Sequence, residues 1–227
     1  MLTGGAGGRA LTRAFEELFA IPDAFRGIPV PGRTDAWILS QAVSTHGIQP
    51  DSPTLARFPE VYLSHLRIEV EQPGPRKNVM PGVRELLDVL SGGDDFYLAL
   101  LTGNYEAAAH VKLRYFDLWR YFTCGAFGDD APDRNALVPK AIRRIAACGG
   151  PSVAASDAIV IGDTPYDIAC AQAAGARSIG VATGSHTVEQ LRAAGADVVL
   201  QDLSDTSEVL RVLRIWRKRL GVERKGS

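Results

Sequence analysis

The sequence predicts an α/β fold, a doubly wound and mostly parallel sheet with helices on both faces, preceded by a small helical module. From about residue 94 onward, short apolar segments alternate with segments of helical period, which is typical of βαβ units. The first third has helical periodicity without a convincing strand. The segment Gln72-Pro73-Gly74-Pro75 between the two parts has the composition of a linker.

In the first third, the apolar spacing predicts helices over residues 9–20, 34–46 and 53–71. Ser52-Pro53 suits the start of the last helix, and Gly47 suits the end of the one before it. The glycine-rich run Gly4-Gly5-Ala6-Gly7-Gly8 is expected to be a flexible leader, although it could also let the backbone approach a ligand closely. We therefore divide the chain into residues 1–8, a helical module over 9–76 and an α/β domain over 77–227.

The α/β part is predicted element by element from the same two periods. Strands are expected at residues 96–101, 122–127, 158–161, 178–182 and 197–200. Helices are expected at residues 83–90, 106–115, 135–147, 167–174 and 188–194, with Gly175 as a C-cap. A final helix carries one apolar stripe, made of Val209, Leu213, Trp216 and Leu220, that can dock on the domain.

Composition excludes several classes of function. The 25 basic and 26 acidic residues nearly cancel, so there is no global attraction to nucleic acid. No apolar run approaches the roughly 20 residues that span a bilayer, and charged residues interrupt the N-terminus where a signal peptide would be apolar. Cys124, Cys148 and Cys170 lack metal-site spacing and are expected to be reduced thiols in a cytoplasmic protein.

The most informative segment runs from Ile159 to Asp167. An apolar β-branched run ends at Gly162-Asp163, and Asp167 follows four residues later, past a proline suited to a first helical turn. This pattern places two carboxylates at the carboxyl end of a strand, the edge at which α/β proteins bind ligands. A carboxylate pair suits Mg²⁺, which prefers oxygen ligands, although both aspartates could equally be turn and cap residues.

Two further features are expected at the same edge. Thr102, Gly103 and Asn104 end a strand with a hydroxyl and exposed backbone N–H groups, which could hold phosphate oxygens. Arg134 opens a helix, where an anion is already favoured. The first could be an ordinary strand-to-helix turn, and Arg134 could simply pair with its neighbour Asp133.

Taken in order, these motifs resemble the haloacid dehalogenase-like hydrolase superfamily, in particular its phosphoglycolate-phosphatase-like branch. The segments 80–87 and 162–176 add to the likeness. The resemblance implies a Rossmann-like core and a helical cap over a Mg²⁺-dependent phosphatase site for a small phosphorylated substrate. It also implies the roles of single residues: Asp163 and Asp167 for metal, Thr102, Gly103 and Asn104 for phosphoryl oxygens, Arg134 for their charge, with Lys140 in reserve, and Arg33 of the cap for substrate.

The superfamily's Asp-x-Asp-x-Thr motif, whose first aspartate attacks phosphorus, does not occur in this sequence. In the superfamily it ends a strand that lies between the strands corresponding to those at Thr102 and Asp163. We therefore expect the natural product to carry an upstream segment and the printed chain to lack turnover. A catalytically silent relative that binds a phosphorylated ligand or a partner, and a dehalogenase, remain alternatives, whereas the missing glycine fingerprint argues against a nucleotide-dependent oxidoreductase. The sequence does not indicate the oligomeric state.

Overall fold

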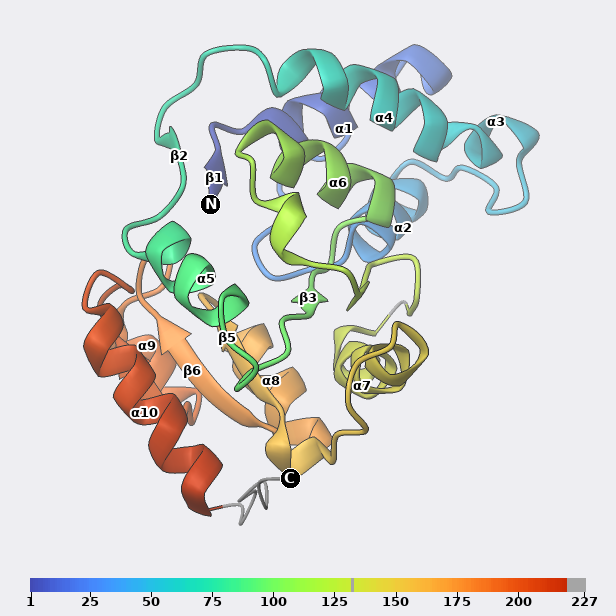
Figure 1. The fold of residues 1–227 in the computed structure, drawn as a ribbon. Helices are drawn as coiled ribbons and strands as arrows, with labels where there is room; N and C mark the ends of the chain where they lie inside the picture. The colour runs from blue at the N-terminus through green and yellow to red at the C-terminus, as the bar shows by residue number, and fades with distance from the viewer. Residues whose placement is uncertain (132, 220–227) are drawn as a thin grey trace.

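The computed structural model describes residues 1–131 and 133–219 and shows an α/β domain beside a group of helices (Figure 1). Five strands of the α/β part run parallel to their partners. They are β3 (Leu100–Leu101), β4 (Gly125–Ala126), β5 (Ile159–Gly162), β6 (Arg177–Val181) and β7 (Val198–Leu200). The predicted fold class, α/β with a parallel sheet, is confirmed.

Helices cover both faces of the three-stranded sheet β5-β6-β7 because successive strand residues point to opposite sides. Ile179 and Val181 of β6 pack with α5 (Val83–Ser91) and α10 (Thr206–Arg219). On the other face, Val160 of β5 packs with α8 (Pro165–Ala174), and α9 (Val188–Ala193) covers β6. Val209 and Leu213 of the predicted α10 stripe are buried, whereas Leu220 lies outside the described residues.

The sheet is divided between β3 and β5. Within the described part of the chain, β3 pairs with β4 and β5 pairs with β6, but β3 and β5 do not pair with each other. The strands predicted at residues 96–101 and 122–127 are each only two residues long in the structure. A strand that is hydrogen-bonded along only one edge has half the backbone partners of an interior strand, which accounts for the short paired length of β3.

The helical module comprises α1 (Ala6–Phe19), α2 (Asp35–Thr45), α3 (Pro53–Ala56) and α4 (Phe58–Glu69). These helices share one hydrophobic cluster around Phe15, Phe58 and Tyr62. The expected leader is partly helical, because Gly5 takes a left-handed conformation (φ 82°) and lets α1 begin at Ala6. A short antiparallel pair, β1 (Leu2–Thr3) with β2 (Lys77–Asn78), was not predicted.

The remaining helices follow the prediction closely. Helix α6 spans Glu106–Tyr115 as expected. The predicted helix 135–147 begins as a 3₁₀ turn, η2 (Arg134–Ala136), and continues as α7 (Leu137–Ala147). Gly175 ends α8 with φ 73°, as its C-cap role requires. Among the described residues, no helix is long and apolar enough to cross a membrane.

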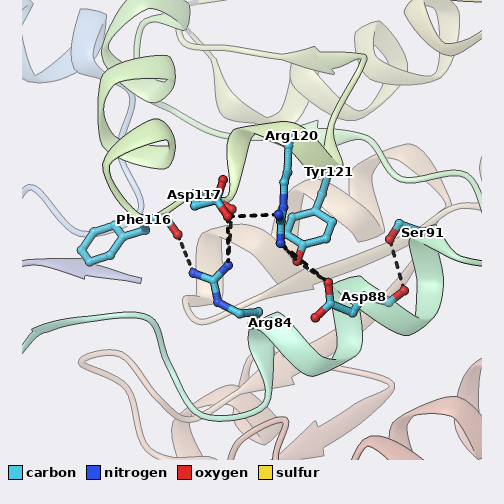
Figure 2. Close-up of polar contacts among 7 residues, drawn as sticks. All are labelled: Arg84, Asp88, Ser91, Phe116, Asp117, Arg120 and Tyr121. Atoms are coloured by element: carbon cyan, nitrogen blue, oxygen red, sulfur yellow. Dashed lines mark hydrogen bonds and ion pairs between the residues drawn. The ribbon is translucent and has the colours of Figure 1, made fainter.

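Exposed polar contacts join α5 to the segment after α6 (Figure 2). Arg84 donates to the Phe116 carbonyl at 2.5 Å, and Arg120 lies 3.2 Å from Asp117. Tyr121 donates to Asp88 on the next turn of α5. Because exposed ion pairs each contribute only about 0–1 kcal/mol, these contacts orient α5 more than they stabilise it.

Candidate functional site at the carboxyl ends of β3 and β5

The turn after β3 is pressed against the loop that enters α2. Asp35 N donates to the Gly103 carbonyl at 2.7 Å. A Cβ added to Gly103 would overlap the Arg33 carbonyl oxygen. The hydroxyl of Thr102 accepts from Asn104 N at 3.2 Å and so closes the turn. Residues 32–35, which include the predicted substrate residue Arg33, therefore lie directly on the predicted phosphate turn, residues 102–104.

We predict that Gly103→Ala lowers the free energy of unfolding by about 1–3 kcal/mol, because backbone must shift to admit the methyl group. Gly93→Ala is the matched control, since a Cβ there would meet no atom within 4 Å, and it should change stability by no more than about 0.5 kcal/mol. Urea unfolding of both variants measures the difference. Equal effects would mean that the two segments are not in close contact.

The side chain of Asn104 is held by two buried charges. It donates to Asp35 Oδ1 at 3.2 Å and accepts from Lys112 Nζ at 3.0 Å. Burial raises the pKa of Asp35, with Lys112 opposing the shift, and burial lowers the pKa of Lys112. Both contacts fix Asn104 as a link between α2 and α6, so its amide is less available to a phosphate than its predicted phosphate-binding role requires.

Lys112 was missed as a site residue, although the sequence carries a signal for it. It lies on the face of α6 that also buries Ala108, Ala109 and Leu113, at the i+3 and i+4 spacing of an apolar stripe. A lysine in such a stripe must find a partner inside the protein. Asn104 accepts its hydrogen bond, and the buried Asp35 carboxylate supplies the opposite charge.

The acid pair lies at the end of β5, as predicted. Thr164 caps α8 through a reciprocal capping box: Asp167 Oδ2 accepts from Thr164 N at 3.0 Å and from Thr164 Oγ1 at 2.8 Å. Gly162 is required here, because a Cβ would overlap the Asp167 carboxyl group. The capping interpretation therefore holds for Asp167 and places its carboxyl group, buried, beside that of Asp163.

Arg134 reaches the acid pair from η2. Its Nη2 donates to Asp167 Oδ1, and its Nη1 donates to the Gly32 carbonyl at 3.1 Å. The alternative partner Asp133 is instead the N-cap of η2. The Nε of Arg134 is buried without a hydrogen-bond partner. One guanidinium thus joins the acidic pair to the 32–35 loop.

The other two predicted site residues, Arg33 and Lys140, make contacts of different kinds. The Arg33 guanidinium is held between two aromatic rings, 4.3 Å from the centroid of Trp37 and 4.3 Å from that of Tyr166. Tyr166 precedes Asp167, so Arg33 borders the acid pair. Lys140 donates to the carbonyl of Asp130, and this contact directs it to the loop before η2 rather than to the acids.

The Asp163 carboxyl group carries unfavourable charge. Burial, and then the neighbouring Asp167 carboxylate, raise the pKa of Asp163, while the Met1 amino group and Arg134 oppose the shift. Gly184 lies against Asp163, and a Cβ there would overlap its Oδ2. Asp163 is therefore packed on several sides while its negative charge is only partly compensated.

Comparison with known proteins agrees with this geometry. Residues 135–206 match a family model described as HAD-hydrolase-like. A probable phosphatase, IndB, of Dickeya dadantii is 32% identical over 127 residues, which is 56% of this chain and 54% of that protein. A phosphoglycolate phosphatase of Agrobacterium fabrum is 31% identical over 151 residues, 66% of this chain and 61% of that protein.

Solved structures agree on the fold. CbbY from Rhodobacter sphaeroides, in complex with phosphate, superposes with a TM-score of 0.64 at 16% identity over 89% of both chains. This chain is similar to haloacid dehalogenase-like hydrolases in part of its sequence and in its fold. Its similarity to phosphoglycolate phosphatases agrees with the resemblance that the sequence motifs indicated. The chain spans 54% and 61% of the length of the two curated relatives described above.

Within this haloacid dehalogenase-like chain, the family match contains the acid pair but not the whole candidate site. Asp163, Asp167 and Lys140 lie inside the matched residues 135–206, whereas Thr102, Arg33 and Arg134 lie outside them. The structure connects the two groups through Arg134 and the 32–35 loop. Tertiary contacts thus extend the site beyond the segment that the family model covers.

The acid pair can be tested for its fit to a divalent cation. Asp163 has a partly buried charge that its neighbours compensate only in part and that a cation would relieve. Mg²⁺ sites commonly use only one or two protein carboxylates, with waters and substrate phosphate as the other ligands. Across residues 1–131 and 133–219, no group of three or more His, Cys, Asp or Glu forms a complete metal cage. The donor set fits Mg²⁺ of this open kind.

Proposed function

We propose that this chain forms most of a Mg²⁺-dependent phosphomonoester hydrolase for a small phosphorylated metabolite of the phosphoglycolate type. The observation that carries the proposal is the meeting of Asp163, Asp167 and Arg134 at the carboxyl end of β5. In such a site the carboxylate whose charge is only partly compensated suits a cation, and the arginine suits a dianionic phosphoryl group bound beside that cation.

Each residue then has a distinct role. Asp163 would be the direct cation ligand, and the cation, when bound, would neutralise charge on the phosphoryl group. Asp167, whose oxygens already accept from Thr164 and Arg134, would hold Arg134 in place. Thr102 and the backbone of Gly103 would bind phosphoryl oxygens.

Arg33 and Lys140 have lesser roles in this proposal. Arg33, fixed by its two aromatic neighbours, would contact the part of the substrate beyond phosphorus. Lys140 would orient the loop that precedes η2, because it binds the Asp130 carbonyl.

The attacking carboxylate is the part that this sequence does not supply. In the superfamily it comes from the Asp-x-Asp-x-Thr strand, and the division of the sheet between β3 and β5 is where such a strand would pair. Ile161 of β5 supports this placement, since this residue is 38% exposed although it belongs to a strand of the core sheet. We propose that a strand carrying this motif completes the sheet and the active site.

The printed chain should therefore release no p-nitrophenol from p-nitrophenyl phosphate in the presence of Mg²⁺, above a no-protein blank. The same chain with an Asp-x-Asp-x-Thr strand joined ahead of Met1 should hydrolyse at least one small phosphomonoester in a substrate screen. Robust release by the printed chain that disappears in Asp163→Ala would contradict our account of the nucleophile.

A silent binding protein is the second candidate. The packing of residues 32–35 on both the Thr102 turn and Arg134 favours it, because the Gly32 carbonyl occupies Nη1 of Arg134, a donor that a transferred phosphoryl group would need. In that case phosphate esters would raise the thermal midpoint of the extended chain without any turnover. Turnover by the extended chain would exclude it.

A further inference from the structure

Cys124 and Cys148 are distant in sequence but adjacent in the fold. Cys124 directly precedes β4 and is 8% exposed, whereas Cys148 caps the end of α7 and is exposed. Both are free thiols, as is Cys170. The sequence spacing of the cysteines did not indicate that two of them are neighbours.

Two independent contacts bring the end of α7 close to the start of β4. Arg144, one helical turn before Cys148 and so on the same face of α7, donates to the carbonyl of Gly125 at 3.1 Å. Tyr97 donates to or accepts from Thr123 at 3.1 Å, and its ring lies 2.6 Å from where a Gly150 Cβ would be. The chain at residues 148–150 therefore runs alongside residues 123–125.

The two thiols also share a cavity. A pocket of about 190 Å³ is lined by Cys124 and Cys148, together with Arg144, Trp119 and Phe127. Burial, and then the nearby Cys148 thiol, raise the pKa of Cys124 to about 11. Cys124 is thus a protonated partner behind an exposed thiol, and the cavity gives a small oxidant access to both.

We propose that Cys124 and Cys148 form a dithiol site that a peroxide closes to an intramolecular disulfide. Hydrogen peroxide oxidises the exposed Cys148 thiol to a sulfenic acid and releases one water. The Cys124 sulfur, losing its proton, then attacks the Cys148 sulfur and displaces the hydroxyl group as a second water. Two thiols and one peroxide thus give one disulfide and two waters.

The Cys124–Cys148 disulfide would affect the candidate site by anchoring α7. The loop between Cys124 and Cys148 contains Arg134, so closing it restricts the unfolded chain and anchors the helix that follows Arg134. The proposal does not depend on phosphatase activity, because its readouts are the bond itself and the thermal midpoint.

The test uses the full chain, reduced and then treated with hydrogen peroxide. After the peroxide is removed, free thiols are alkylated in denaturant and the peptides are identified by mass spectrometry. We expect a Cys124–Cys148 cross-linked peptide, Cys170 alkylated, and a thermal midpoint about 5–10 °C higher than in the reduced protein. Cys148→Ser should abolish both changes, and Cys170→Ala should keep both.

A second measurement needs no oxidation. Phenylarsine oxide, which bridges two neighbouring thiols, should bind the reduced chain one to one and should not bind Cys124→Ser or Cys148→Ser in the same way. The proposal is overturned if peroxide yields only a sulfinic acid or a covalent dimer at Cys148 while Cys124 remains alkylatable. It is equally overturned if the arsenical binds the two variants as well as it binds the parent chain.

Discussion

Replacing Arg134 with methionine should lower the free energy of unfolding by about 3 kcal/mol at pH 7. The side chains of Arg134 and Asp167 are only 15% and 10% exposed, and they form a direct ion pair. Removing the arginine leaves a buried carboxylate without its cation and leaves the Gly32 carbonyl without a donor. Losing one partner costs more free energy than the intact ion pair contributes to stability, because the carboxylate that remains is buried away from water.

Arg143→Met is the control for this prediction. Arg143 is exposed on α7, so its replacement should change stability by no more than about 0.5 kcal/mol. A double-mutant cycle with Asp167→Asn should give a coupling energy of at least about 1 kcal/mol between positions 134 and 167. If Arg134→Met destabilises no more than Arg143→Met, the ion pair does not organise the site.

The sequence predicted the elements whose signals are local. Helix α6 has its expected bounds. The end of β5, the following proline in the first turn of α8 and the glycine that ends α8 were predicted within two residues. These features depend on backbone conformation and capping, which neighbouring residues determine. The acid pair was placed correctly for the same reason.

What the sequence could not predict depends on contacts between distant segments. Strand β3 is only two residues long because it has a partner on one edge only. A local sequence pattern does not indicate whether a strand has a partner on each edge. The Asn104 side chain is turned by Lys112 and Asp35, residues of two different helices. The proximity of Cys124 and Cys148 follows from how α7 packs on β4.

Substitution at Asp163 should separate function from stability. Asp163→Asn in the printed chain should raise stability at pH 7, because the change removes a carboxylate whose charge is disfavoured by burial and by Asp167. The folded pKa of Asp163 is raised above its ordinary value of 3.8, so the charged form costs stability above the folded pKa and the cost disappears below 3.8. The gain from asparagine should therefore vanish as the pH falls through that window, as chemical unfolding at a series of pH values would show.

Active sites commonly retain a residue that costs stability because its chemistry requires it. The neutral amide introduced by Asp163→Asn would keep the shape of the site but would no longer attract a cation to it. Asp157→Asn is a suitable control, because this residue lies in the turn before β5 and not at its carboxyl end. It should leave both stability and activity nearly unchanged.

The most direct test of the central claim is the Mg²⁺-dependent turnover of Asp163→Asn in the chain completed by an Asp-x-Asp-x-Thr strand. We predict that the completed chain hydrolyses a small phosphomonoester and that Asp163→Asn lowers kcat/KM by about 10³-fold or more, while Asp157→Asn keeps it. A completed, folded chain that shows no turnover on any phosphomonoester, or one in which Asp163→Asn retains full activity, would contradict the assignment of this site to phosphoryl transfer.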